Sequence, residues 1–300
     1  MIVSLAAALA ATANAQQEAE DPDPPRDPPA QAQPGRQPRS PEAAEPEEDP
    51  ADRQISLQVE LRPWFVAPGG RYVLPGETRG GRDIDVEDLN IDGARLSPAG
   101  RVRLEVDEWS FAVAGARVGA DRRTNSPVTR PIGDIDIAQG DALRTQMRYT
   151  TAELLVGNTF FQRSLHAFDY PESRFGLELE AGLGARFDRF DIRLEREAGG
   201  EARADELFLM PLAAFEARFK PSPRTTLSFA VTAGWNPGLG DQTAVTTDLI
   251  VRTGWQVLPR VQAIAGYRIT IQRMESGDGP QRFEFNGSHA GLYGGLRIGF

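Results

Sequence analysis

The chain has 300 residues, of which 25% are charged, and it carries a formal net charge of −10 without a single cysteine. These values exclude a disulfide framework, and they exclude the basic patch that nucleic-acid binding requires. Most of the negative charge belongs to residues 16–53, which hold eleven acidic side chains against four arginines, so residues 54–300 are close to neutral.

Residues 1–15 (MIVSLAAALAATANA) contain no charged side chain and end in the small-residue pattern Ala13-Asn14-Ala15. An apolar run of this length is too short to cross a bilayer as a helix, and the polar shift at Gln16 is typical of a secretory cleavage site. The usual basic n-region is missing, and the alternative is an ordinary apolar terminal helix. We expect residues 1–15 to be a signal peptide.

Residues 16–53 contain ten of the 23 prolines and almost no large apolar side chains. Such a segment buries too little surface to offset the entropy lost on ordering, so it predicts a disordered linker. This arm either stays in the periplasm, where it would reach toward peptidoglycan, or enters the interior of the following domain.

Residues 54–300 alternate apolar and polar side chains with a period of two, which indicates β-strands. The pattern predicts ten strands, within a range of eight to twelve, because segments 109–120 and 144–157 have ambiguous facing. Long and short connections alternate: the long ones are 67–96, 122–142, 191–204, 237–243 and 276–281. The shorter ones are 107–108, 158–171, 221–223 and 258–259.

Alternating long and short connections are typical of an outer-membrane barrel, whose periplasmic turns are short and whose outer loops are long. We therefore predict an all-β, antiparallel, up-and-down transmembrane β-barrel over residues 54–300, with both termini in the periplasm and a bacterial outer-membrane location. Aromatic residues near strand ends suit interfacial girdles: Phe65, Phe187, Phe219, Trp235, Trp255 and Phe300. The alternative is a soluble sandwich or lipocalin-like barrel, in which the apolar face would point inward.

The final ten residues, GLYGGLRIGF, alternate up to the terminal phenylalanine. With apolar residues at Leu292, Leu296, Ile298 and Phe300, the stretch resembles the C-terminal signature of bacterial outer-membrane barrels, although Gly294 interrupts it. This resemblance implies recognition by the barrel-assembly machinery. Residues 83–120, which include DLNIDGARLSPAGRVRLEV, also resemble a pattern of small, mostly uncharacterised outer-membrane barrels. That family implies a fold and a location but no activity.

The polar faces of the predicted strands carry charges that would point into the barrel lumen. The set comprises Glu60, Arg62, Arg101, Arg103, Glu105, Glu178, Glu180, Arg186, Glu216, Arg218, Asp248, Arg252, Arg268 and Arg297. Neither sign dominates, and side chains fill much of the interior of a barrel this narrow. Mixed charges therefore favour a largely plugged lumen and a structural or surface-interaction role. The alternative is a narrow porin-like channel for small solutes.

Few residues suggest chemistry. Asp88, Asn90 and Asp92 have the oxygen spacing of half a calcium loop, but Ala99 occupies the position that requires a bidentate Glu. The alternation of Ile84, Val86, Leu89 and Ile91 indicates a loop strand there instead.

The histidines His166 and His289 have no partner motif, so we expect both to be polar surface residues. We expect no enzyme activity and no cofactor. The expected partners are outer-membrane lipid and lipopolysaccharide, to which an acidic loop (Asp83, Asp85, Glu87 and Asp88) could bind through bridging divalent cations.

Overall fold

The computed structural model describes residues 55–77, 81–167, 170–238 and 240–300, without the side chains of 164–167 and 170–175. The predicted signal peptide (1–15) and proline-rich arm (16–53) lie outside the described residues and stay predictions. In the described ranges, no helix combines the length and the apolar character needed to cross a membrane.

The described chain is built almost entirely of strands. The first eight are β1 (Ile55–Leu61), β2 (Trp64–Val73), β3 (Ile84–Asp85), β4 (Arg95–Ser97), β5 (Ala99–Val106), β6 (Trp109–Asn125), β7 (Arg130–Ile132) and β8 (Ile135–Ile137). The remaining elements are β9 (Ala142–Ala167), β10 (Tyr170–Arg196), β11 (Glu201–Ser222), β12 (Thr225–Pro237), β13 (Gln242–Leu258), β14 (Val261–Ser276), the 3-10 helix η1 (Gly279–Gln281) and β15 (Phe283–Gly299).

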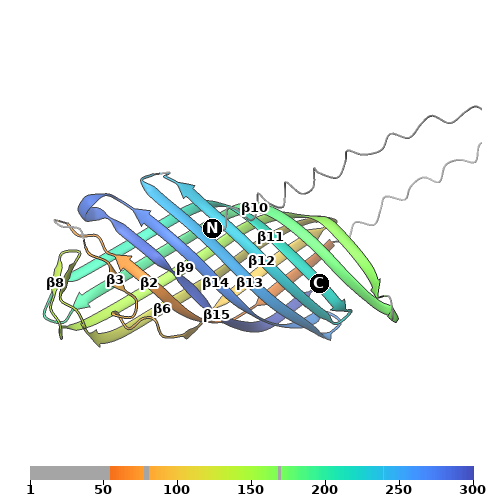
Figure 1. Ribbon diagram of the computed structural model, residues 1–300, viewed down its shortest axis with the longest axis horizontal. Helices are drawn as coiled ribbons and strands as arrows, with labels where there is room; N and C mark the ends of the chain where they lie inside the picture. The colour runs from red at the N-terminus through yellow and green to blue at the C-terminus, as the bar shows by residue number, and fades with distance from the viewer. Residues whose placement is uncertain (1–54, 78–80, 168–169, 239) are drawn as a thin grey trace, which may run out of the picture. The chain divides into compact units, whose positions relative to one another are not determined.

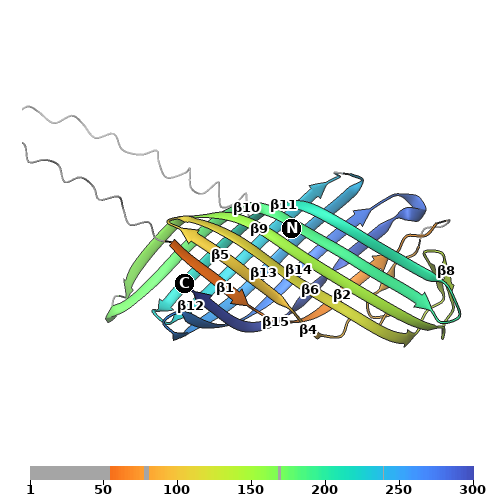
Figure 2. The same cartoon turned by 180° about the vertical axis from the view of Figure 1, so that it is seen from behind.

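Thirteen strands form one antiparallel sheet that closes into a barrel (Figure 1, and from behind in Figure 2). The last strand, β15, closes it by pairing with β1 through Leu296 and Leu61 and with β2 through Leu292 and Phe65. β1 and β2 are two halves of one wall strand, broken at Pro63, because proline cannot donate to the ladder. β4 and β5 are divided in the same way at Pro98. Counted so, the wall has ten strands, which confirms the predicted all-β barrel.

The two ends of the barrel differ in their connections. Tight turns such as Asp107-Glu108 lie at the end that holds Ile55 and Phe300, whereas β3, the β7–β8 hairpin and η1 lie in the connections of the opposite end, the loop end. The predicted loop 158–171 is wrong, because β9 continues to Ala167 after a register shift near Phe160 that interrupts the period of two. The predicted loop 191–204 is also wrong, since β10 reaches Arg196 and β11 begins at Glu201.

The outer face of the lower barrel, by which we mean the half nearest Ile55 and Phe300, is apolar. Each of the ten wall strands exposes at least one large hydrophobic side chain; examples are Leu183 at 70% and Leu227 at 45% exposure. This apolar belt ends at one level on four adjacent strands. Across β6, β9, β10 and β11, the outward positions Arg117, Thr150, Arg189 and Leu207 are cross-strand neighbours, and charged residues follow beyond them.

The polarity of the wall inverts above the belt. On β10, Arg193 and Glu195 point outward, while Ile192 and Leu194 are completely buried. The same inversion explains why strands that continue above the belt resemble loops in the sequence: their outer face is charged. Because the inner face is apolar at this level, other apolar side chains must pack against it inside the barrel.

An aromatic and aliphatic cluster fills the interior of the loop end. Wall strands contribute Tyr72, Tyr149, Phe190, Phe208, Phe283 and Phe285. The connections contribute Ile84, Val86, Leu89, Ile91, Ile132, Ile135 and Ile137. Tyr72 stacks on Phe285 with 4.7 Å between ring centroids, and Phe190 lies 4.9 Å from the same ring. We call this group the aromatic cluster.

Candidate functional site

The lower interior, inside the apolar belt, holds a network of charged side chains. All fourteen of the predicted lumen charges lie on the inner face of the wall, and each takes part in at least one ion pair with another described residue. They fall into two groups at different depths. We call these the terminus-side network and the inner network.

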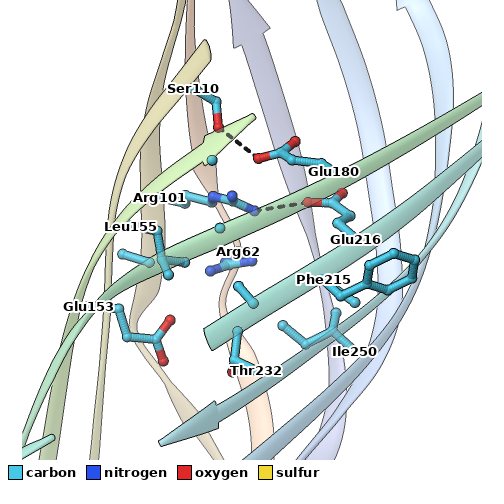
Figure 3. Close-up of a pocket in the computed structure, with 15 residues that line it drawn as sticks. Arg62, Arg101, Ser110, Glu153, Leu155, Glu180, Phe215, Glu216, Thr232 and Ile250 are labelled. Carbon is cyan, nitrogen blue, oxygen red and sulfur yellow. Dashed lines mark hydrogen bonds and ion pairs between the residues drawn. The ribbon is translucent and has the colours of Figure 1, made fainter. Parts of the chain in front are cut away.

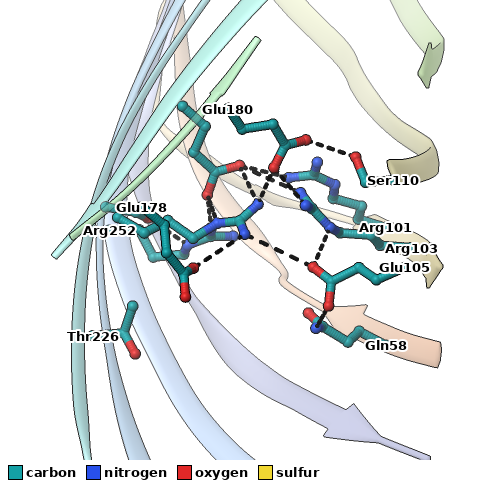
Figure 4. Close-up of polar contacts among 12 residues, drawn as sticks. Gln58, Arg101, Arg103, Glu105, Ser110, Glu178, Glu180, Thr226 and Arg252 are labelled. Atoms are coloured by element: carbon teal, nitrogen blue, oxygen red, sulfur yellow. Dashed lines mark hydrogen bonds and ion pairs between the residues drawn. The ribbon is translucent and has the colours of Figure 1, made fainter. Parts of the chain in front are cut away.

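The terminus-side network surrounds Glu60, Glu180 and Glu216. Figure 4 shows the part of it that holds Arg103, Glu180 and Arg252. Its members are Glu60, Arg62, Arg101, Arg103, Glu105, Glu178, Glu180, Glu216, Arg218, Lys220, Arg252 and Arg297. Arg252 joins two of the carboxylates, with Nη2 2.7 Å from Glu216 and Nη1 3.1 Å from Glu60. Arg218 joins Glu216 at 2.9 Å and Glu180 at 2.6 Å. These contacts cross the interior, since their five side chains come from four strands, β1, β10, β11 and β13.

The inner network lies between the terminus-side network and the aromatic cluster, and consists of Glu153, Arg186, Asp188, Asp248 and Arg268. Arg186 is fully buried and contacts Asp188 at 2.8 Å, Asp248 at 3.2 Å and Glu153 at 3.3 Å. Arg268 also pairs with Asp248 and Glu153, and its guanidinium lies 5.2 Å from the ring centroid of Trp64. A buried ion pair of this kind holds one arrangement, because losing either partner leaves an uncompensated charge.

Tyr149 connects the inner network to the aromatic cluster. Its hydroxyl donates to Asp188 at 2.7 Å and accepts hydrogen bonds from Arg186 and Gln272, each at 2.8 Å. Its ring stacks on His289 with 4.4 Å between centroids. The polar and apolar layers are therefore continuous across the interior.

The sequence missed several members of these networks. Glu153 belongs to segment 144–157, whose facing was ambiguous because Leu155 on the inner face is as apolar as Leu154 on the outer face. Asp188 lies on the polar face that the sequence alternation assigns to β10, but it was not counted among the lumen charges. Lys220 continues the inward alternation of β11 and could have been found by extending it. Ser110, which donates to Glu180 at 2.6 Å, lay in the other ambiguous segment.

The predictions for the histidines and the acidic loop need correction. His289 is not a surface residue: it is completely buried, because its strand position faces inward. The side chain of His166 lies outside the described residues. The predicted loop strand at residues 84–91 is limited to Ile84–Asp85, and residues 86–90 form turns that bury Leu89 and Ile91 in the aromatic cluster.

One of the candidate calcium ligands is engaged by a cation in the described structure. Asp88 pairs with Arg130 at 3.4 Å, and Asn90 occupies the left-handed region with φ of 53°. Within the described ranges, no group of three or more His, Cys, Asp or Glu residues could hold a metal ion.

The C-terminal residues Leu292, Leu296, Ile298 and Phe300 are placed on the outer face of β15 and just beyond it, in the apolar belt. Phe300 donates its backbone N–H to Leu57 at 2.9 Å, which ties the end of the chain to β1.

A charged groove lies on the outer wall directly above the belt, over β6, β9, β10 and β11. Its volume is about 450 Å³, and its ionisable lining residues are Arg117, Asp121, Arg148, Asp191, Arg193 and Arg203. We call the four arginines of this groove the arginine collar. Arg144 and Gln146 donate hydrogen bonds to Asp121, which lies above the belt, and lower the pKa of its carboxyl to about 2. The groove therefore keeps its mixed charge throughout the physiological pH range.

Comparison with protein-family models gave no match, and comparison with curated proteins gave none. Among solved structures, the chain is similar to the outer-membrane protease OmpT of Escherichia coli at 11% identity and a TM-score of 0.44, covering 84% of this chain and 98% of that one. It is also similar to the Neisserial surface protein A at 12% identity and a TM-score of 0.29, with 81% and 96% covered. A third likeness is to the toluene transporter TodX of Pseudomonas putida, at 10% identity and a TM-score of 0.23, with 84% and 89% covered.

Likenesses this distant assign no function, and the class of protein follows from the molecule itself. The barrel has no open edge in the described residues, its outer face carries an apolar belt, and at the level of this belt the charges lie inside. Only a structure that pairs every backbone group internally can cross hydrocarbon with strands. The chain therefore has the architecture of a transmembrane β-barrel.

Proposed function

We propose that this protein is a structural and surface-interaction barrel whose lumen is closed, and that it has no enzymatic activity. The observation that carries the proposal is the inverted loop end, where the aromatic cluster occupies the interior of the barrel. Three layers follow one another along the barrel axis: the terminus-side network, the inner network and the aromatic cluster. A solute would have to displace buried ion pairs and then a packed apolar core.

The alternative, a narrow channel, requires a continuous polar path. The terminus-side network supplies polar groups, but its carboxylates and guanidinium groups are engaged with one another across the interior. Selective pores place a ring of one charge sign around open space. The mixed signs and the apolar layer above them favour a closed interior.

Planar-bilayer recording of the refolded chain tests this proposal. We expect no discrete current steps, with insertion verified by the different migration of boiled and unboiled samples. Arg252→Ser and Arg268→Ser should leave this silence unchanged, because the aromatic cluster would still close the barrel. Reproducible unitary steps from the unmodified chain, changed in size by either substitution, would establish the channel alternative instead.

The arginine collar provides the surface for interaction, and the ligand that suits it is the phosphate-bearing headgroup of lipopolysaccharide. The collar lies directly above the apolar belt, where the headgroups of the outer leaflet meet the wall. Arg148 contacts Asp191 at 3.9 Å, and Arg203 contacts Asp191 at 3.9 Å and Asp205 at 3.8 Å, so neither arginine that lines the groove is held in a close ion pair. Arg117 forms no ion pair with any described residue. A guanidinium group can bind a phosphate through two parallel hydrogen bonds.

Replacing Arg148 and Arg203 together by Ser should weaken binding of purified lipopolysaccharide to the detergent-solubilised barrel. At about 1 kcal/mol for each basic residue near an anionic lipid surface, the pair should cost roughly 30-fold in affinity. The matched control replaces Arg71 and Arg273, which also point outward but on β2 and β14. Equal losses from both double variants would mean that binding is non-specific electrostatic attraction and not a property of the collar.

A further inference from the structure

One buried and one largely buried arginine in the lower interior have too few partners. Arg62 is 6% exposed, and its one ion pair to a described residue runs to Glu60 at 3.6 Å. Arg101 reaches Glu216 at 3.7 Å, and its buried Nε has no hydrogen-bond partner in the described structure. Both distances exceed that of a charge-assisted hydrogen bond. Arg218 and Arg252, in the same network, hold carboxylates at 2.6 to 2.9 Å.

The two arginines are also neighbours. Arg101 pairs with Glu60 across β1 and β5, and the backbone N–H of Arg62 donates to Ala99 at 3.0 Å, so the two residues occupy diagonal positions on the same inner face. Like charges at neighbouring positions of a sheet repel each other. Arg62 further lies within electrostatic range of Arg252 and Arg268.

Both side chains line one internal cavity (Figure 3). Its volume is about 50 Å³, which exceeds the roughly 10–15 Å³ that a cavity needs to hold one water molecule. Thr232 lines the same cavity with a buried hydroxyl that has no partner in the described structure. Small and apolar residues, including Ala114, Ala214 and Ile250, form part of the remaining wall. The cavity is therefore lined by two cations and one hydroxyl donor, together with a group of apolar side chains.

Three carboxylates also line the cavity, but each is already neutralised by other arginines. Glu153 pairs with Arg186 and Arg268, each at 3.3 Å. Glu180 pairs with Arg103 and Arg218, and Glu216 pairs with Arg218 and Arg252. The terminus-side network as a whole contains seven basic residues and five acidic ones, so it has a surplus of positive charge. The under-used cations are Arg62 and Arg101.

We propose that this cavity binds one small monovalent anion of about the size of chloride, between the guanidinium groups of Arg62 and Arg101, with the Thr232 hydroxyl as a further donor. The anion relieves the repulsion between the two arginines and completes their coordination. It reaches the cavity from the terminus side, where a polar recess of about 150 Å³ also includes Arg101 in its wall. The anion stays bound at this site and does not pass through the barrel, so the proposal is compatible with a closed lumen.

Two measurements on the refolded chain test the site. Crystals soaked in bromide should show an anomalous peak between Arg62 and Arg101. The temperature at which the barrel converts to its slower-migrating, unfolded form should be higher in sodium chloride than in sodium gluconate at equal ionic strength, because gluconate is too large for the cavity and a ligand that binds only the folded state stabilises it.

Arg62→Met should remove both the bromide peak and the difference between chloride and gluconate. Arg123→Met, which removes an exposed arginine from the outer face, should leave both unchanged. A cavity that contains only water in bromide-soaked crystals, or a chloride effect that persists in Arg62→Met, would overturn the proposal. If Arg62→Met does not fold, the bromide peak in the unmodified protein decides the question.

Discussion

Leu183→Arg is expected to lower the free energy of unfolding of the membrane-embedded barrel by about 2–4 kcal/mol, the cost of an arginine on the lipid face at the bilayer midplane. Leu183 points outward from β10 at 70% exposure, with apolar outward neighbours toward both ends of its strand. Urea unfolding of the protein in lipid vesicles, followed by tryptophan fluorescence, measures the change.

The matched control is Leu207→Arg on the adjacent strand. Leu207 is also an exposed, outward leucine, but it pairs with Arg189 at the level where the charged wall begins. The cost there should fall to about 0–1 kcal/mol. Equal costs at the two positions would show that the belt does not have the depth assigned to it.

Arg186→Met should destabilise the barrel by about 3–5 kcal/mol, because it leaves buried carboxylates without their shared cation. Arg186 contacts Asp188, Glu153 and Asp248, and all four side chains are buried. Arg268 would still pair with two of the carboxylates, but Asp188 would keep only hydrogen bonds from neutral groups. The same vesicle unfolding assay measures the effect.

Neutralising the carboxylates should reverse much of this loss. The triple variant Arg186→Met, Asp188→Asn, Glu153→Gln removes the uncompensated charge together with its partner, and replacing both partners of a buried interaction costs less than removing one. A single Arg186→Met variant as stable as the unmodified chain would contradict the view that the inner network fixes the interior.

Much of this barrel could be predicted from alternation alone. When the two faces of a strand lie in different environments, apolar and polar residues alternate along its sequence and show which residues share a face. The facing of Glu216 and Arg252 could be derived because apolar neighbours such as Phe215 and Val251 point the other way. Facing could not be derived for Glu153 or His289. Leu154 and Leu155 are equally apolar on opposite faces, and His289 lies between Ser288 and Ala290, which provide no contrast.

The polarity inversion could not be predicted either. Ile192 and Leu194 alternate with Arg193 and Glu195 in the same way as belt residues alternate with lumen charges. Local pattern does not distinguish an apolar face turned to lipid from one turned to a core. That distinction depends on Leu89, Ile91 and the β7–β8 hairpin, which are distant in sequence and pack inside the loop end.

Position-by-position labelling of β10 tests the central claim, an apolar belt below an inverted loop end, most directly. The chain has no cysteine, so each single substitution introduces a unique thiol. A fluorophore at Leu179→Cys, Leu183→Cys or Phe187→Cys should be quenched by a quencher in the lipid and not by aqueous iodide, and at Asp191→Cys or Arg193→Cys the order should reverse. Quenching by iodide at all five positions would contradict the membrane-spanning belt, and quenching by the lipid probe at all five would contradict the inversion.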